Sequence, residues 1–420
     1  MDTNRRRSLA VVTNLNAPRS EAGRYRLTHK FIEGMQAYVK AWDGPVHAFF
    51  DPRIPDSGNL DNVEVGAEDV GFGIHVQPFG TREFYAELAG RGVVMGGPNH
   101  LARDIAARCR AIAVPCVYNV EYTLRTRLQF LRAERPNPLR QIWGGVWELR
   151  QEAVTVRELR LAAGVQCNGL PCYNKYSPIN DSPLVYFDNR IRQEDLATEQ
   201  QILDGNERRR RGQPLQLYFS GRLIKAKGAD HLLKVARALK SRGVRFHMTI
   251  CGDGVLTPLL KQQIGSFGLA SDVTLTGVLD FSSELLPRLK SHADLFVCCH
   301  RQGDPSCTYI ETFACGVPIV GYANEALATF VKETQAGAAT PLDKPEALAD
   351  LIARLDAERD QLCIWAYRAR DFAAQHTMER TFDARIKHLA TICDKALARE
   401  RPSLSSSSPV SAPLPRTGEA

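Results

Sequence analysis

The sequence predicts an α/β protein with two Rossmann-like βαβ domains that face a cleft. Two series of short apolar strands alternate with helical patterns, one over residues 8–205 and one over residues 213–375. Strands that alternate with helices of about 10–15 residues indicate parallel sheets with right-handed crossovers. A chain of 420 residues is also too long for one ordinary hydrophobic core, so two domains are expected.

The first series supplies the N-terminal domain. Its clearest strands are LAVVTN, PVHAFF, GVVMGG, VPCVYNV and PLVYFD, and helical stretches such as FIEGMQAYVKAW and HLARDIAARCRAIA separate several of them. A polar, highly charged segment follows these strands and ends in ERRRRGQP. Such a segment is typical of a linker, so we place the domain boundary between residues 205 and 213.

The second series is more regular than the first. It alternates strands LQLYFS, VRFHMTICG, DVTLTG, ADLFVCC and PIVGY with helices near residues 229–242, 256–267, 284–291, 306–315 and 345–355. A helical segment over residues 376–400 follows, and we expect it to pack back toward the first domain. Residues 401–420 are rich in Ser and Pro and lack a hydrophobic pattern, which predicts a disordered tail.

Composition indicates a soluble, cytoplasmic protein. The hydrophobic fraction of 44% and charged fraction of 24% are ordinary for globular chains. No apolar run approaches the ~20 residues that span a bilayer. The start MDTNRRRSLAVVTN has only LAVV between its basic and polar parts, which favours a first β-strand over an export signal. The 11 cysteines form no Cys-x-x-Cys pair and are expected to be small buried hydrophobes.

Metal and nucleic-acid sites are not expected. Three consecutive residues, Cys298, Cys299 and His300, cannot all face one ion from a strand. The basic runs Arg5–Arg7 and Arg208–Arg211 are not interleaved with aromatics, as nucleic-acid surfaces usually are. Each run fits a solvated loop or helix end, or alternatively a surface that attracts anionic lipid head groups or anionic substrates.

The most informative stretch is HRQGDPSCTYIETFACGVPIVGYANE, residues 300–325. An acidic loop containing Asp304 runs into a short helix, and Ser306 is a favourable N-cap because its hydroxyl can accept from an unpaired backbone N–H. Unpaired N–H groups and the positive helix end favour an anion. Glu311 lies on the second turn of the same helix. One segment therefore offers an anion cradle and a carboxylate, which together suit a nucleotide diphosphate with its sugar.

A second candidate segment is LYFSGRLIKAKGADHLL, residues 217–233. A strand ends at Ser220, and Arg222 and Lys227 flank the turn before the next helix. In open parallel sheets, ligands collect at this end of the strands. Two cations beside Gly228, which permits close backbone approach, could neutralise a diphosphate. Alternatively, the segment is a surface loop with two ordinary cations.

Taken together, these segments resemble the retaining glycosyltransferases of the GT-B fold, the family 4-type group. GRLIKAKGADHLL is similar to the nucleotide-binding segment of that family, and ICGDGVLTPLL to its next strand and turn. VTLTGVLDFSSELLPRLKSHADLFVCC resembles the stretch that cups the base, and GDPSCTYIETFACGVPIVG the paired-acid segment near the donor sugar. The resemblance is close over residues 217–340 and loose over the first domain.

The resemblance implies roles in donor binding. Arg222 and Lys227 would hold the diphosphate, and Glu311 would accept hydrogen bonds from the ribose. Asp253 and the stretch Gly277, Val278 and Leu279 would lie near the nucleotide.

The chain departs from the family pattern at one acid. The family usually places its first acid eight residues before the second, and Gly303 occupies that position here. Asp304 comes one residue late, so the backbone N–H groups of Ser306, Cys307 and Thr308 are expected to contribute more to donor binding.

The first domain is expected to supply the acceptor site and part of the catalytic surface. Its candidates all lie just past strand ends: Arg19, Gly23, Asn99, His100, Glu121, Arg125, Asp188, Asn189 and Arg190. His100 fits either a polar clamp at the cleft, which would act in catalysis, or a simple surface histidine. Glu121 and Arg125 follow a strand after which relatives often carry a histidine.

The resemblance implies transfer of a sugar from a nucleotide-sugar to a hydroxyl acceptor with retention at the anomeric carbon. It implies no covalent protein nucleophile, no metal and no other cofactor, because cationic side chains would stabilise the diphosphate. The acceptor would be a glycan, a lipid-linked molecule or a small molecule. An enzyme that extends a lipid-linked glycan would contact the inner face of the membrane.

Other functions remain open at this stage. A sugar-nucleotide epimerase, a phosphorylase and a non-catalytic nucleotide-sugar-binding protein would all suit the same two-domain fold. A phosphorylase would need a lysine-bound pyridoxal phosphate, and no lysine can be nominated for it.

Overall fold

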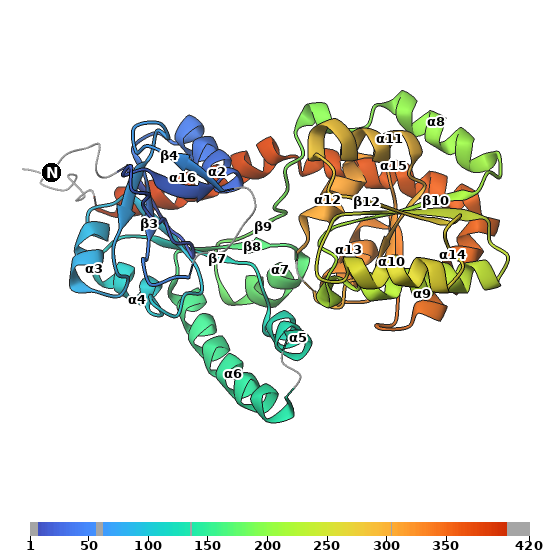
Figure 1. Cartoon of the computed structure of the whole chain (residues 1–420). Coiled ribbons are helices and arrows are strands. Elements are labelled where there is room, and N and C mark those ends of the chain that lie inside the picture. Colours follow the sequence, from blue (N-terminus) through green and yellow to red (C-terminus); the bar gives the residue numbers. More distant parts are fainter. Residues whose placement is uncertain (1–6, 56–61, 135–136, 304, 401–420) are drawn as a thin grey trace, which may run out of the picture.

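The computed structural model describes residues 7–55, 62–134, 137–303 and 305–400 of the chain. They form two α/β domains, each built on a parallel sheet with helices around it (Figure 1). The predicted fold class is therefore confirmed. Three sequence predictions lie outside the described residues: the tail over residues 401–420, the cations Arg5 and Arg6, and Asp304.

The first domain holds a seven-stranded parallel sheet in the order β5-β3-β1-β6-β7-β8-β9. Its strands are apolar because helices cover both faces. The strands are β1 (Leu9–Val12), β3 (Val46–Phe50), β5 (Gly73–Val76), β6 (Val93–Gly96), β7 (Cys116–Val120), β8 (Gly164–Asn168) and β9 (Pro183–Tyr186); β2 (Tyr25–Thr28) and β4 (Asn62–Val65) form a separate antiparallel pair. The helices are α2 (His29–Ala41), α3 (Arg82–Leu88), α4 (Ile105–Ala111), α5 (Leu124–Glu134), α6 (Pro138–Leu161) and α7 (Leu170–Tyr176), with the 3₁₀ turn η1 (Ser177–Ile179).

The second domain holds a six-stranded parallel sheet in the order β12-β11-β10-β13-β14-β15. The strands are β10 (Leu215–Ser220), β11 (Phe246–Cys251), β12 (Val273–Gly277), β13 (Leu295–Cys298), β14 (Ile319–Tyr322) and β15 (Gly337–Thr340). The helices are α8 (Glu199–Arg210), α9 (Ala229–Ser241), α10 (Thr257–Ser266), α11 (Leu286–His292), α12 (Cys307–Ala314), α13 (Glu325–Thr334), α14 (Pro345–Ala357) and α15 (Arg359–Gln375). Short turns of other helix types are η2 (Gln193–Asp195), η3 (Lys225–Lys227) and η4 (Phe281–Leu285).

Two sequence predictions about boundaries need correction. The helix expected from residue 100 begins only at Ile105, because the Asn99 side chain accepts a hydrogen bond from the Leu101 N–H at 2.7 Å and forms a turn. The domain boundary at residue 205 would cut α8, which belongs to the second domain. Ile202 packs against Ala366 in one buried cluster. The chain therefore crosses between domains before α8.

The chain crosses between the domains a second time at α16 (Met378–Glu400), which returns to the first domain (Figure 1). Its buried residues Ile386, Leu389 and Ile392 share one apolar cluster with strands of the first sheet. The two crossings are joined, since the Met378 N–H donates to the Ile191 carbonyl at 2.6 Å.

The predictions from charge and cysteine content can be compared with the described residues. Arg208 and Arg209 both pair with Asp294, and Arg7 pairs with Asp43. All 11 cysteines are free, and every one except the half-buried Cys307 is buried. In the described part of the chain, no helix is both long and apolar enough to cross a bilayer. The same residues contain no cluster of three or more His, Cys, Asp or Glu side chains suited to a metal.

Shortening Leu389 should destabilise the first domain. Leu389→Ala removes a fully buried side chain from the α16 cluster, so the free energy of unfolding should fall by about 2–5 kcal/mol. Urea unfolding followed by circular dichroism measures this loss. Ile364→Ala, at an exposed position of α15, is the control and should change stability by less than about 0.5 kcal/mol. Equal stability of the two variants would show that α16 does not contribute to this core.

Candidate functional site

The predicted anion-binding segments lie side by side at the carboxyl edge of the second sheet. Strand β10 runs into Arg222 and η3, and its neighbour β13 runs into the loop that precedes α12. Ligands bind at this edge in open α/β sheets. The fold therefore brings the two candidate segments together although about 80 residues separate them in the sequence.

A close backbone contact joins the two loops. Gly228 has φ +66°, and a Cβ atom there would lie 1.9 Å from the Cys299 carbonyl oxygen. The Arg301 N–H donates to the Ala226 carbonyl at 3.0 Å. The Arg301 guanidinium donates to the Lys225 carbonyl at 2.5 Å and to the Asp230 carboxylate at 2.7 and 3.0 Å. These contacts fix the position of the backbone around Lys227.

The surroundings of Lys227 keep its neighbouring histidine neutral. Lys227 and His300 are both buried, and burial together with the Lys227 charge lowers the pKa of His300. The ring nitrogens of His300 have no hydrogen-bond partner among the described residues. The imidazole lies near the rings of Phe219 and Tyr309. A neutral ring places no second positive charge beside Lys227.

Arg222 is exposed at the turn after β10.

Helix α12 presents its N-terminus at the same edge. Ser306 is the N-cap residue, but its side chain makes no capping hydrogen bond within the described structure, contrary to the expectation for this hydroxyl. The N–H groups of Cys307 and Thr308 have no intrahelical acceptor, since they belong to the first turn. These backbone donors are therefore suited to an anion.

The Glu311 carboxylate is already paired. It is buried on the second turn of α12, and its Oε1 accepts a hydrogen bond from the Arg190 Nε at 2.9 Å. The Arg190 guanidinium also stacks over the Phe281 ring at 3.8 Å. Arg190 and Glu311 are both candidates from the sequence, but no sequence pattern indicates that they bond to each other.

The predicted nucleotide contacts continue along the edge. The Gly252 N–H donates to the Gly277 carbonyl at 2.7 Å, which sets the end of β12 against the turn at Asp253. The Asp253 carboxylate accepts from Thr257 Oγ1 and from the Gly254 N–H, and these bonds lower its pKa. Val278 is largely exposed and Leu279 partly buried.

A cluster of charged groups forms where the two domains meet. The Lys30 Nζ of α2 lies 2.6 Å from the Asp188 Oδ2 and 3.5 Å from the Cys307 Sγ of α12. Burial raises the pKa of the Cys307 thiol to about 12, so the thiol is protonated at neutral pH. Desolvation by the surrounding protein and the Asp188 charge also raise the pKa of Glu121, although its side chain is exposed to solvent. Lys30 was not predicted, because it follows a strand outside the main sheet and has no motif around it.

Helix α5 of the first domain holds the loop before α12. Thr126 Oγ1 donates to the Gly303 carbonyl at 3.0 Å, and the Gln129 Oε1 accepts from the Gly303 N–H at 2.8 Å. Thr123 donates to the Glu325 carboxylate at 2.5 Å. A Cβ atom at Gly303 would lie 3.0 Å from the Glu325 Cβ, so an acidic side chain would need its neighbours to move. This close packing disfavours a larger residue at Gly303.

The other first-domain candidates lie on different elements. Arg125 is exposed on α5, and His100 is exposed in the loop after β6, not at a helix start. Arg19 bonds to the Tyr25 hydroxyl and stacks on its ring, while Gly23 forms a turn with φ +75°. Asn99 is buried in the loop after β6.

Asn189 is a predicted acceptor-site residue whose side chain forms hydrogen bonds within the protein. Its side chain is buried, and its Nδ2 donates to the Phe187 and His376 carbonyls at 2.9 and 2.8 Å. Its Oδ1 accepts from the Ile191 N–H. These bonds occupy the side chain within the protein, so we assign Asn189 to holding the two domain crossings together.

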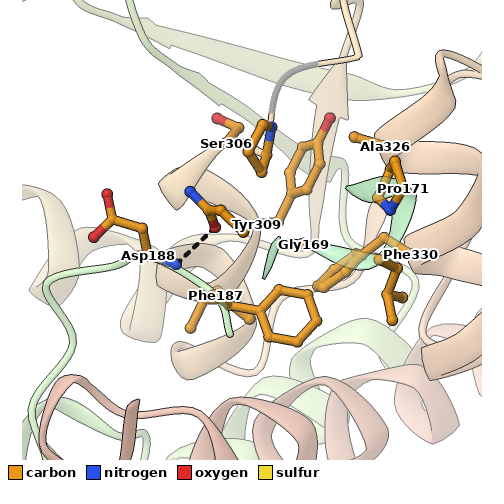
Figure 2. A pocket seen from close by; sticks show the side chains of 12 residues that line it. Gly169, Pro171, Phe187, Asp188, Ser306, Tyr309, Ala326 and Phe330 are labelled. Carbon is orange, nitrogen blue, oxygen red and sulfur yellow. Dashed lines mark hydrogen bonds between the residues drawn. The ribbon is translucent and has the colours of Figure 1, made fainter. Parts of the chain in front are cut away.

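A small cavity lies at the domain junction beside Ser306. Figure 2 shows the rings of Phe187 and Phe330 on one side of it and Gly169 and Pro171 of the first domain on another, with the Asp188 carboxylate turned away from the rings. Its volume of about 20 Å³ suffices for one water molecule. Ligand pockets usually enclose about 300–1,000 Å³, so this cavity is a packing void and not the donor site.

Sequence comparison finds relatives of the second domain. Residues 203–372 match the family model described as "Glycosyl transferases group 1". The alpha-D-kanosaminyltransferase of Streptomyces kanamyceticus is 29% identical over 142 residues, which cover 34% of this chain and 36% of that protein. The GDP-mannose-dependent alpha-(1-6)-phosphatidylinositol monomannoside mannosyltransferase of Mycolicibacterium smegmatis is 25% identical over 175 residues, covering 40% and 45%. The chain thus spans less than half the length of these curated relatives.

Structural comparison covers both domains. The crystal structure of Anabaena HepE in complex with UDP superposes with a TM-score of 0.62 at 14% identity, covering 92% of this chain and 99% of that one. Two α/β domains, each built on a parallel sheet, in this arrangement define the GT-B fold. The matched residues 203–372 lie in the second domain and make up less than half of the chain, so the chain is similar to the glycosyl transferases group 1 over that domain. Membership of family 4 within that group stays a prediction.

Adding a methyl group at Gly228 should impair nucleotide binding. Gly228→Ala would drive a Cβ into the Cys299 carbonyl and separate the two loops, so affinity for nucleoside diphosphates should fall at least about tenfold. Gly243→Ala is the control, because Gly243 has a similar φ of +71° but no atom within 4 Å of the place its new methyl group would take. Isothermal titration of UDP, GDP and ADP measures the effect. Equal affinity in both variants would mean that the loop contact does not shape the site.

Proposed function

We propose that the protein transfers a sugar from a nucleotide-sugar donor to a hydroxyl acceptor, with retention at the anomeric carbon and without a metal. The observation that carries the proposal is the meeting of Arg222, Lys227 and the α12 N-terminus at one sheet edge. Two cations and a row of backbone donors suit a diphosphate leaving group. The mannosyltransferase relative is described as GDP-mannose-dependent and HepE was crystallised with UDP, which supports a nucleotide-sugar donor.

The donor would lie across the edge with its nucleoside toward α11 and its sugar toward the first domain. Arg190 occupies the Oε1 atom of Glu311, so we assign the Oε2 atom to the ribose hydroxyls. The base would rest beside Gly277 and Val278, where backbone groups are accessible. The diphosphate would lie between Arg222, Lys227 and the α12 N-terminus.

Bond breaking would place negative charge on the diphosphate as the anomeric carbon–oxygen bond opens. Arg222, Lys227 and the α12 donors would stabilise that charge. The acceptor oxygen would attack the same face of the sugar and give its proton to a phosphate oxygen. The cluster of Lys30, Asp188 and Glu121 would bind the acceptor, because it lies on the first-domain side of α12.

Removing the Arg222 charge should slow sugar transfer strongly. Arg222→Ala should lower kcat by about 10²–10³-fold, the usual effect of losing one well-placed donor to a developing anion. Arg222 is exposed, so the melting temperature should not change. Arg237→Ala, at another exposed arginine, is the control and should keep full activity. Release of nucleoside diphosphate in the presence of acceptors measures turnover, and near-normal turnover of the Arg222 variant would remove this residue from the mechanism.

The stereochemistry and the metal requirement can be tested in one reaction. Proton NMR of the product should show the donor's anomeric configuration, and excess EDTA should leave the rate unchanged. An inverted product or a loss of activity that Mg²⁺ or Mn²⁺ restores would contradict the proposal. Conversion of the donor sugar without any acceptor would instead indicate an epimerase.

A further inference from the structure

Helix α6 carries an exposed apolar face that the donor site does not explain. Trp143 is 75% exposed and Trp147 is 48% exposed. Leu139, Ile142 and Val146 are exposed as well. The spacing of these five residues puts them on one side of an α-helix, in a stripe about 12 Å long. We call these five residues the α6 stripe. Figure 1 shows that this part of α6 extends away from the body of the first domain.

The opposite side of α6 packs against α5. A Cβ atom at Gly144 would lie 2.6 Å from the Leu131 side chain of α5, so the two helices are in close contact. Arg127 of α5 pairs with Glu148 at 2.7 Å and with Glu152 at 2.8 Å. The α6 stripe therefore points away from the protein. Exposed apolar surfaces of this kind mark interaction sites.

Basic side chains surround the stripe. Arg140 and Arg150 of α6 and Arg132 of α5 are exposed, and none of them forms an ion pair with another described residue. Between residues 138 and 153 the carboxylates are Glu148 and Glu152; Arg127 pairs with both, and Lys175 also pairs with Glu152. The outer side of α6 therefore combines tryptophans with unneutralised positive charge.

We propose that the α6 stripe docks the protein on a membrane surface that contains anionic lipids. Trp143 and Trp147 would enter the boundary between head groups and acyl chains, where amphipathic rings are favoured. Arg140 and Arg150 would reach the lipid phosphates while their aliphatic parts stay against the apolar layer. Helix α6 would lie on the bilayer and not cross it.

A second copy of the chain fits this face less well. A two-fold interface would use the same patch on both copies and would bring their Arg140 and Arg150 side chains into one buried region. The described part of this face has no spare carboxylate to neutralise them. An anionic lipid surface supplies the missing negative charge.

The arginine run in α8 is not an alternative membrane contact. Arg208 and Arg209 pair with Asp294, Arg210 with Asp360, and Arg211 with Glu207. The sequence makes this run a candidate for lipid attraction, but each of its arginines already forms an ion pair within the protein. Helix α5, by contrast, joins the α6 stripe to the donor loop, because it packs on α6 and bonds to Gly303.

Vesicle binding by the full-length protein tests the proposal. The protein should co-sediment with phosphatidylglycerol-containing vesicles at least about tenfold more tightly than with pure phosphatidylcholine vesicles, and rising salt should weaken binding. Trp143→Ser combined with Trp147→Ser should reduce this affinity at least about tenfold. Ile364→Ser, at an exposed apolar position on α15, is the control and should bind like the unchanged protein.

Two double variants test how much the arginine charges contribute to vesicle binding. Arg140→Gln with Arg150→Gln should abolish the preference for anionic vesicles, whereas Arg210→Gln with Arg211→Gln should keep it. Absence of vesicle binding, or binding that the tryptophan variants leave unchanged, would overturn the proposal. A dimer in light scattering that the tryptophan substitutions dissociate would assign the stripe to a second copy and overturn it as well. None of these measurements involves sugar transfer, so their outcome is independent of the proposed function.

Discussion

The close approach of Gly228 to the Cys299 carbonyl is the constraint on which the candidate site depends. It sets the loop after β10 directly against the loop after β13, and only glycine leaves room for this contact at a positive φ. Arg301 keeps the two loops together through its bonds to Lys225 and Asp230. Lys227 and the α12 N-terminus thus have fixed positions before any ligand binds. Electrostatic stabilisation is most effective when the donors need no reorganisation.

The site is shared between the domains. Thr126 and Gln129 of α5 hold Gly303, and Lys30 of α2 pairs with Asp188 beside Cys307. These contacts explain how a chain can carry glycine at the position of the first acid, because the first domain stabilises that loop by hydrogen bonds. They also connect the donor loop, through α5, to the helix that bears the exposed tryptophans.

Residues close together in the sequence were the predictable part of this molecule. The alternation of apolar strands with helices predicted the second domain, and the turn residues around Arg222 and Ser306 indicated the two loops that the structure places side by side. Contacts between distant segments were not predictable, because neither periodicity nor spacing records them. The bond from Arg190 to Glu311 and the place of Lys30 beside Asp188 are of this kind. The helix expected from residue 100 failed for a local reason, since the Asn99 side chain favours a turn.

A crystal structure of the protein with a bound nucleoside diphosphate tests the central claim most directly. Crystals soaked with UDP, GDP or ADP should show the diphosphate within hydrogen-bond distance, about 3 Å, of Arg222, Lys227 and the N–H groups of Cys307 and Thr308. The ribose should contact Glu311. A diphosphate bound elsewhere, with the loops at Gly228 and Ser306 empty, would contradict the account.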